Sequence, residues 1–151
     1  MPYRHRSPPA RFASNSVYLE LLGNGGLYTV NYDRRFSSHW STRIGIMLFG
    51  GQSEEPTDDR ISFALIPVML NYLVGEGSHR LELGIGPLIG VVGGHLEEYG
   101  WIAGSGLAGV TSTVGYRYQL PGGGFVFRVS LTPFYSGEPQ LWGGVSFGYA
   151  F

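Results

Sequence analysis

Apolar and polar residues alternate along most of this chain with a period of two residues. Between residues 28 and 33, for example, Tyr, Val and Tyr alternate with Thr, Asn and Asp. Successive residues of a β-strand point to opposite sides, so this alternation predicts strands with one apolar and one polar face. Turn residues divide the chain into eight such segments, which we expect near 16–23, 26–36, 40–50, 60–74, 79–92, 106–119, 124–135 and 141–151.

The two faces of these segments differ in size as well as in polarity. One face carries bulky apolar side chains, such as Val17, Leu19, Val30, Ile44, Ile46, Val68, Leu70, Leu83, Ile85, Val114, Phe127, Val129, Leu131 and Phe147. The other carries polar or small residues, such as Thr29, Asn31, Gly45, Asn71, Gly84, Gly86, Thr113, Gly115, Ser130, Thr132, Gly144 and Ser146. The interior of an eight-stranded barrel is only just wide enough for side chains, so the bulky face must look outward, at lipid. We therefore predict an all-β fold, an eight-stranded antiparallel up-and-down transmembrane β-barrel.

The composition suits many strands joined by tight turns. Glycine accounts for 25 of the 151 residues, aromatics for 15% and charged residues for only 14%. The chain has no cysteine, which excludes disulfide bonds and thiolate metal sites, and its net charge of −1 gives no sign of nucleic-acid binding. It also lacks the run of about 18 apolar residues that a transmembrane helix needs, whereas a transmembrane strand needs only about 9–11 residues.

Aromatic residues gather near the end of the expected barrel that holds both chain termini. An even number of strands places the two termini on one side, which we call the terminus side. The aromatic residues at this side would form the girdle expected at a membrane interface, and they are Phe36, Trp40, Tyr72, Tyr116, Tyr118, Tyr149 and Phe151.

Eight charged residues fall on the inward face. They are Glu20, Asp33, Arg35, Arg43, Arg80, Glu82, Arg117 and Arg128. A single buried charge is costly, but arginine–carboxylate pairs are tolerated because the planar guanidinium binds a carboxylate with two hydrogen bonds. We predict a charge network that plugs the lumen of a barrel with a structural or interaction role. The alternative is a narrow conduit for small solutes, in which this network opens.

The opposite, outer end of the expected barrel is acidic. Seven of the eleven carboxylates fall in its loops, at Glu54, Glu55, Asp58, Asp59, Glu97, Glu98 and Glu138. Two interpretations stay open: these loops bind Ca²⁺ or Mg²⁺ that also bridges lipopolysaccharide phosphates, or they are ordinary solvated loops. Their spacing does not match an EF-hand.

A third function to weigh is a lipid-modifying enzyme of the outer leaflet. His95, Glu97 and Ser105 belong to one expected outer loop, residues 93–105, and could imitate a Ser–His–acid set. A loop without rigid support rarely holds such geometry, so we expect no enzymatic activity, no catalytic residue and no cofactor. Residues 104–109 match G-x-G-x-x-G, but the stretch that follows alternates like a strand, whereas a dinucleotide site needs a helix there.

The start of the chain differs from the rest. Residues 1–15 are basic, include three prolines and show no alternation. We expect a flexible N-terminal extension, residues 1–15, followed by one barrel domain, residues 16–151. The extension lacks the apolar segment of a secretory signal peptide. We therefore expect either that the true start lies upstream of Met1 or that the chain begins after cleavage.

Several segments resemble known outer-membrane barrels. Residues 17–36, with the sequence VYLELLGNGGLYTVNYDRRF, resemble the opening hairpin of small eight-stranded outer-membrane β-barrel proteins of the OmpA/OmpW-like superfamily. Residues 66–72 (IPVMLNY) and 81–86 (LELGIG) are similar to its middle strands. The closing strand resembles the insertion signal of the family, with alternate apolar residues and a terminal aromatic at Val145, Phe147, Tyr149 and Phe151.

This resemblance covers residues 16–151 and implies location and topology more than activity. It implies the outer membrane of a Gram-negative bacterium, with lipid and lipopolysaccharide around the barrel. It also implies that the barrel-assembly machinery recognises the closing strand during insertion. Barrels of this kind serve as anchors, adhesins, small-solute conduits and enzymes, so the resemblance leaves the ligand, the biological process and the oligomeric state open.

Overall fold

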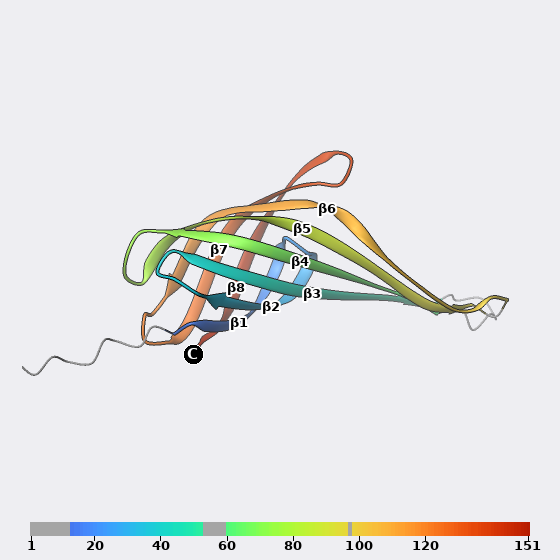
Figure 1. Ribbon diagram of the computed structural model, residues 1–151, viewed down its shortest axis with the longest axis horizontal. Helices are drawn as coiled ribbons and strands as arrows, with labels where there is room; N and C mark the ends of the chain where they lie inside the picture. Colours follow the sequence, from blue (N-terminus) through green and yellow to red (C-terminus); the bar gives the residue numbers. More distant parts are fainter. Residues whose placement is uncertain (1–12, 53–59, 97) are drawn as a thin grey trace, which may run out of the picture.

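The computed structural model describes residues 13–52, 60–96 and 98–151. Its strands are β1 (Asn15–Gly23), β2 (Gly26–Arg35), β3 (Trp40–Gln52), β4 (Arg60–Val74), β5 (His79–Leu96), β6 (Gly100–Gln119), β7 (Gly124–Tyr135) and β8 (Pro139–Ala150). Each strand pairs antiparallel with the next, and β8 pairs with β1 to close the barrel (Figure 1). The predicted all-β, eight-stranded antiparallel barrel is confirmed. Among the described residues, no helix is long and apolar enough to cross a membrane.

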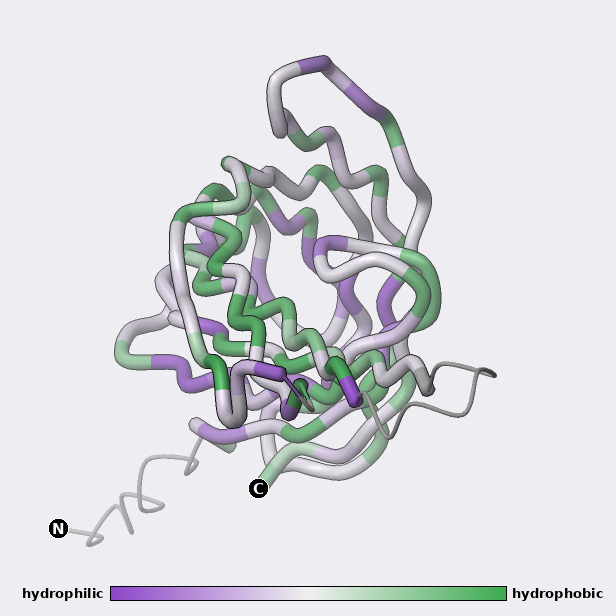
Figure 2. The backbone as a smooth tube through the Cα atoms, turned by 90° about the vertical axis from the view of Figure 1, so that its right-hand side faces the viewer, coloured by the Kyte–Doolittle hydropathy of each residue, from purple (hydrophilic) through white to green (hydrophobic). Residues whose placement is uncertain are grey.

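Within the closed part of the barrel, alternate residues of the strands face the lumen and the exterior, whereas residues 101–107 in the projecting part of β6 are all exposed. On β7, Val126 and Arg128 are buried, whereas Val129 and Leu131 are 43% and 55% exposed. A view along the barrel shows the strands as a ring, with hydrophilic and hydrophobic residues interspersed along them (Figure 2). The predicted orientation, with bulky apolar residues outside and polar residues inside, is confirmed on this strand.

The strands β5 and β6 are longer than the sequence pattern predicts. Residues 93–105 were expected to form an outer loop, but most of them belong to these two strands and pair across the hairpin. Gly94 lies opposite Ile102, and His95 lies opposite Trp101. The prediction of a loop was wrong because the glycines of this stretch, which resemble turn signals, stand within paired strands, where an opposite strand supplies the hydrogen bonds.

The wall of the barrel has very different heights around its circumference. The strands β1 and β2 have 9 and 10 residues, whereas β5 and β6 have 18 and 20. At about 3.4 Å per residue, β5 and β6 are roughly 30 Å longer than β1 and β2. The strands β3 to β6 therefore project beyond the rest of the barrel as a sheet, which narrows to the right in Figure 1.

The low β1–β2 hairpin turns its tip into the lumen. Leu22 has a φ of 50°, and the alternation breaks there because Leu21 and Leu22 are both exposed. After this break, Gly23 and Asn24 are buried. A Cβ atom at Gly25 would lie 2.1 Å from Thr29 Cγ2, so any other residue there would have to displace the Thr29 side chain. The hairpin thus covers the outer end of the charged lumen.

The terminus side has a small apolar cluster inside and aromatic contacts outside. Ala13, Val126 and Ala150 form a small buried cluster. On the exterior, Trp40 and Tyr72 meet edge to face at 4.9 Å between ring centroids. Of the predicted girdle, Phe36, Trp40, Tyr72, Tyr116, Tyr149 and Phe151 are exposed at this side. Residues 1–12 of the expected N-terminal extension lie outside the described residues, and residues 13–15 pack against the barrel rim.

The charged lumen as candidate functional site

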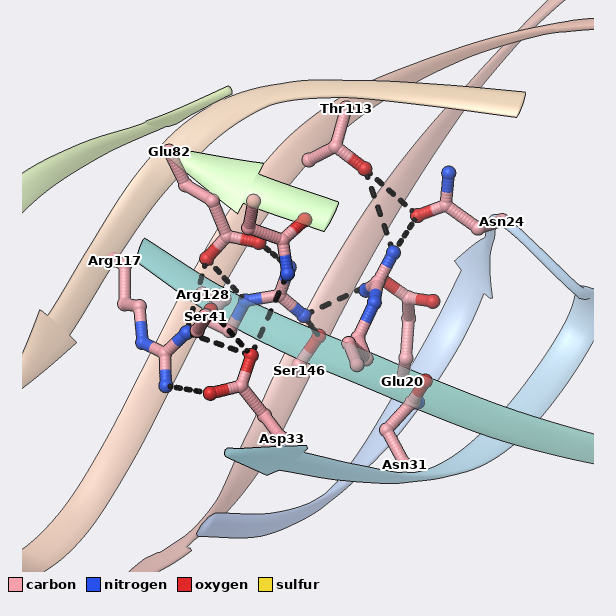
Figure 3. A network of polar contacts seen from close by, with 12 residues as sticks. Glu20, Asn24, Asn31, Asp33, Ser41, Glu82, Thr113, Arg117, Arg128 and Ser146 are labelled. Carbon is pink, nitrogen blue, oxygen red and sulfur yellow. Dashed lines mark hydrogen bonds and ion pairs between the residues drawn. The ribbon is translucent and has the colours of Figure 1, made fainter. Parts of the chain in front are cut away.

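Six charged side chains form one continuous line of alternating charge through the lumen. In order, the line runs Arg43, Glu20, Arg128, Glu82, Arg117 and Asp33, and each neighbouring pair is an ion pair. Each of the six residues is at most 1% exposed. Three guanidinium groups and three carboxylates cancel, so this line carries no net charge. We call it the lumen charge chain, and Figure 3 shows most of its members.

The centre of the lumen charge chain is the pair of Arg128 and Glu82. Arg128 donates from Nε to Glu82 Oε2 at 3.0 Å and from Nη2 to Glu82 Oε1, which makes the pair bidentate. Its Nη1 also donates to Ser146 on β8 at 3.3 Å, and its Cζ lies 4.6 Å from the centroid of the Tyr18 ring. Charge-assisted bidentate pairs are the strong hydrogen bonds of proteins, so this contact ties β5 to β7 across the lumen.

The terminus-side part of the lumen charge chain centres on Arg117. This guanidinium donates to both oxygens of Asp33, at 3.1 and 3.2 Å, and to Glu82 at 3.4 Å. It also donates to Gln119 Oε1 at 2.6 and 2.9 Å. Asp33 accepts a further hydrogen bond from Ser41 at 3.0 Å. Each charge therefore has several partners, which is the condition under which a buried ion pair is tolerated.

The tip of the β1–β2 hairpin covers the outer end of the lumen charge chain. Asn24 Oδ1 accepts from Arg43 Nη2 at 2.5 Å and from Thr113 Oγ1 at 2.9 Å. Its Nδ2 donates to Thr111 Oγ1 at 2.6 Å and to the carbonyl oxygen of Ser112 at 2.9 Å. One amide thus joins β3 to β6 above the charges (Figure 3). Nothing in the alternation identifies Asn24, which the sequence places in an ordinary Asn-Gly turn.

Three further buried residues of the lumen could have been predicted from the alternation but were missed. Tyr18 is 2% exposed and shares the parity of Glu20 on β1, so the alternation already places it inside. The same holds for Met69 and Leu73, which share the parity of Asn71 on β4 and are at most 1% exposed. These apolar residues were overlooked because polarity, and not parity alone, was used to select the inward set.

Two of the eight predicted lumen residues stand apart from the lumen charge chain. Arg35 and Arg80 are each 8% exposed and lie at the terminus side of the lumen. Arg80 donates to two backbone carbonyl oxygens, those of Gly77 at 3.2 Å and of Ser38. Arg35 Nε is buried and has no hydrogen-bond partner among the described residues. The structure therefore brings six of the eight predicted charges into the lumen charge chain. The other two, Arg35 and Arg80, lie where the lumen opens at the terminus side, which we call the mouth.

The remaining candidate sites are placed as follows. Of the acidic outer loops, Glu54, Glu55, Asp58, Asp59 and Glu97 lie outside the described residues. Within the part of the chain that is described, no group of His, Cys, Asp and Glu side chains could hold a metal ion. The fragment 104–109 that matches G-x-G-x-x-G lies wholly within β6.

The structure does not bring His95 and Ser105 together. Ser105 pairs with Val91, four residues before His95 on β5, which corresponds to about 13 Å along the strand. The His95 ring instead contacts Trp101 at 5.3 Å between centroids. The predicted imitation of a Ser–His–acid set is therefore not supported by the positions of its serine and histidine.

The expected insertion-signal residues Val145, Phe147 and Tyr149 lie on the outer face of β8, and Phe151 follows the end of this strand. Phe147, Tyr149 and Phe151 are 46%, 62% and 60% exposed, and Val145 is half-buried. Phe151 exchanges two backbone hydrogen bonds with Asn15 at 2.8 and 3.0 Å, where the last strand meets the first. The apolar row is thus available to lipid while the backbone closes the barrel.

Comparison with known proteins relates this fold to a group of solved structures. No family model matches the sequence, and no curated protein matches it. The N-terminal β-barrel domain of Pseudomonas aeruginosa OprF superposes with a TM-score of 0.60 and 16% identity, over 91% of this chain and 98% of that one. Neisserial surface protein A superposes with a TM-score of 0.53 and 10% identity, over 90% and 95% of the two chains.

A third similar structure is Ail, the attachment invasion locus protein of Yersinia pestis, with a TM-score of 0.47 and 12% identity over 91% of this chain and 97% of that one. The fold of this chain is the closed eight-stranded antiparallel β-barrel that the OprF domain and Neisserial surface protein A share with it. The apolar residues that cover its exterior need lipid around them. The chain therefore has the fold of these barrels and an exterior suited to lipid.

Proposed function

We propose that this protein is a closed outer-membrane barrel, which acts as a structural or interaction scaffold and does not conduct solutes. The observation that carries this proposal is the lumen charge chain. All of its members are at most 1% exposed, so water does not reach them through the lumen. An eight-stranded barrel has room only for the side chains of its interior, and here that room is filled.

The contacts of the plug support a permanent closure. The members of the lumen charge chain come from six strands, and Asn71 on β4 and Ser146 on β8 add hydrogen bonds to Asp33 and Arg128. Every strand of the barrel therefore contributes a polar side chain to the same network. Opening a path would separate several charged pairs at once in a medium of low dielectric constant, which is strongly unfavourable.

The projecting sheet of β3 to β6 supports the interaction role. It extends past the short β1–β2 hairpin and carries exposed aromatic residues near its far end, such as Tyr99 and Trp101, which are 73% and 84% exposed. A closed barrel that holds such a sheet above the membrane is suited to presenting a surface. The surrounding lipid and lipopolysaccharide are the partners that this position offers first.

Planar-bilayer recording tests the proposal against the alternative of a narrow conduit. We expect the reconstituted wild-type protein to show no steady conductance, and the double variant Glu82→Ala, Arg128→Ala to show small openings because the centre of the plug is removed. Val129→Ala, an outward change on the same strand, serves as the control and should stay silent. Steady, ohmic conductance of the wild-type protein would establish the conduit instead.

A further inference from the structure

The buried charges of the lumen do not balance. Among the described residues, five buried arginines face three buried carboxylates, an excess of two positive charges. The lumen charge chain accounts for three of each sign. The excess therefore resides on the remaining two cations, Arg35 and Arg80, both at the terminus-side mouth. A charge that is largely withdrawn from water is costly unless an opposite charge compensates it.

Among the described residues, no side-chain carboxylate is free to compensate Arg35. The two carboxylates that act on it electrostatically are Asp33 and Glu82, and both already pair with arginines of the lumen charge chain. Arg80 and Arg117 repel it. Residues 1–12 contain neither Asp nor Glu.

Arg80 is in a similar position. Its guanidinium donates to the neutral carbonyl oxygens of Gly77 and Ser38. Glu76, in the β4–β5 turn, acts on it electrostatically but is exposed to solvent, and no ion pair joins the two side chains. Carbonyl oxygens satisfy hydrogen bonds without cancelling charge, so the positive potential at the mouth persists.

A hollow lies beside these two cations. It has a volume of about 260 Å³ and is lined by Ser14, Arg35, Phe36, Ser37 and Ser38. Arg80 is not part of this lining, but its guanidinium donates to the carbonyl oxygen of Ser38, so it lies next to the hollow. The Ser37 hydroxyl, which accepts from the backbone N–H groups of His39 and Trp40, keeps its own proton to donate to an anion. Arg35 Nε is buried beside the hollow and has no hydrogen-bond partner among the described residues.

We propose that Arg35 and Arg80 form an anion-binding site at the terminus-side mouth of the lumen, and that its ligand is a phosphate group. Guanidinium groups match the geometry of phosphate oxygens, and hydroxyl donors complete the contacts that a tetrahedral oxyanion needs. The phosphate can belong to a lipid headgroup, which the exposed Phe36 at the rim would meet in the membrane interface, or to a soluble molecule. A bound phosphate compensates the excess positive charge of Arg35 and Arg80, and the lumen charge chain does not depend on it.

The test measures stability as a function of phosphate. A ligand that binds only the folded state raises the free energy of unfolding as its concentration rises. We expect the urea midpoint of the full chain, folded in octyl glucoside micelles, to increase with inorganic phosphate relative to chloride at equal ionic strength. The variants Arg35→Gln and Arg80→Gln should lose at least nine-tenths of this increase. Arg34→Gln, which removes the same charge from the exposed neighbouring position, is the matched control and should keep it.

A second arm identifies the source of the phosphate. Dihexanoyl phosphatidylglycerol is titrated in the same micelles, with the same three variants. Stabilisation by inorganic phosphate that requires Arg35 assigns a soluble ligand, and stabilisation by the lipid alone that requires Arg35 assigns a headgroup. The proposal is overturned if neither probe stabilises the wild-type protein, or if Arg34→Gln and Arg35→Gln reduce the effect equally.

Folding of the variants is itself informative. In buffer without phosphate, Arg35→Gln should leave the urea midpoint unchanged or raise it, because it removes an uncompensated charge. A purely structural role for Arg35 predicts a lower midpoint under the same conditions, and that result would also overturn the proposal. The conductance test of the closed barrel is independent, since the plug lies beyond the mouth.

Discussion

The inside and the outside of this barrel are made by alternate residues of the same strands, but they are stabilised by different interactions. Arg128 is 1% exposed and has defined partners on three other strands, whereas Val129, the next residue, is 43% exposed on the exterior. An interior residue of this kind is specified by the identity of its partners. An exterior residue needs only to be apolar, because lipid adapts to its shape. Substitutions at the two positions should therefore behave differently.

The largest expected effect is that of Arg128→Leu. It leaves Glu82 with one of its two arginines and removes one of the two arginine partners of Glu20. It also removes the cation that lies over the Tyr18 ring. Breaking a buried ion pair by removing one partner costs about 3–5 kcal/mol. Urea unfolding in lipid vesicles measures this loss. Arg34→Leu, an exposed arginine at the rim, is the control, and an equal loss for both would contradict the role assigned to the lumen charge chain.

The next largest effect is expected for Val129→Arg on the exterior. An arginine on the lipid face near the bilayer midplane costs about 2–4 kcal/mol. Val129→Ala, by contrast, should cost much less, since lipid fills the space that the smaller side chain leaves. Both are measured by the same unfolding experiment. If Val129→Arg is tolerated, the assignment of the two faces on β7 is wrong, because a shift of one residue exchanges them.

A smaller effect is expected for Asn24→Ala at the hairpin tip. The change leaves Arg43 and the hydroxyls of Thr111 and Thr113 without their amide partner, and a buried polar group without a partner costs about 1–3 kcal/mol. The control is Asn15→Ala, whose amide oxygen accepts a hydrogen bond at an exposed position. An Asn24 variant as stable as the Asn15 variant would show that the tip does not hold the outer end of the plug.

The smallest effect on stability is expected for Phe151→Asp. The side chain is 60% exposed and the backbone contact with Asn15 is kept, so the refolded barrel should lose no more than about 1 kcal/mol. Its level in the outer membrane should nevertheless fall severalfold, if the assembly machinery recognises the closing aromatic. Phe125→Asp, an aromatic of similar exposure on β7, should assemble normally. Equal outer-membrane levels for both variants would remove the insertion signal.

The sequence could predict those features that depend on the alternation alone. The parity of Arg128 and Val129 follows from the period of two, as does the inward position of Glu20 and Tyr18. The barrel itself follows from the mismatch between the bulky face and the narrow interior. These properties are local, because each residue's side is fixed by its neighbours in sequence.

The features that sequence reasoning missed depend on contacts between distant parts of the chain. Asn24 enters the lumen because its amide finds Arg43, Thr111 and Thr113, none of which is near it in sequence. The extension of β5 and β6 through Gly94 and Gly104 depends on pairing between two glycine-rich stretches that each resemble a loop. The order of the lumen charge chain likewise depends on how six strands are arranged around the barrel.

The most direct test of the lumen charge chain is a double-mutant cycle with Glu82→Leu and Arg128→Leu, measured by urea unfolding in lipid vesicles. Each single change leaves an unbalanced buried charge, whereas the double change removes one charge of each sign and leaves two neutral pairs, Arg43 with Glu20 and Arg117 with Asp33. We predict that the double variant is at least as stable as the less stable single variant, with a coupling energy of about 2 kcal/mol or more. Losses that add to within about 0.5 kcal/mol would contradict a continuous chain of paired charges.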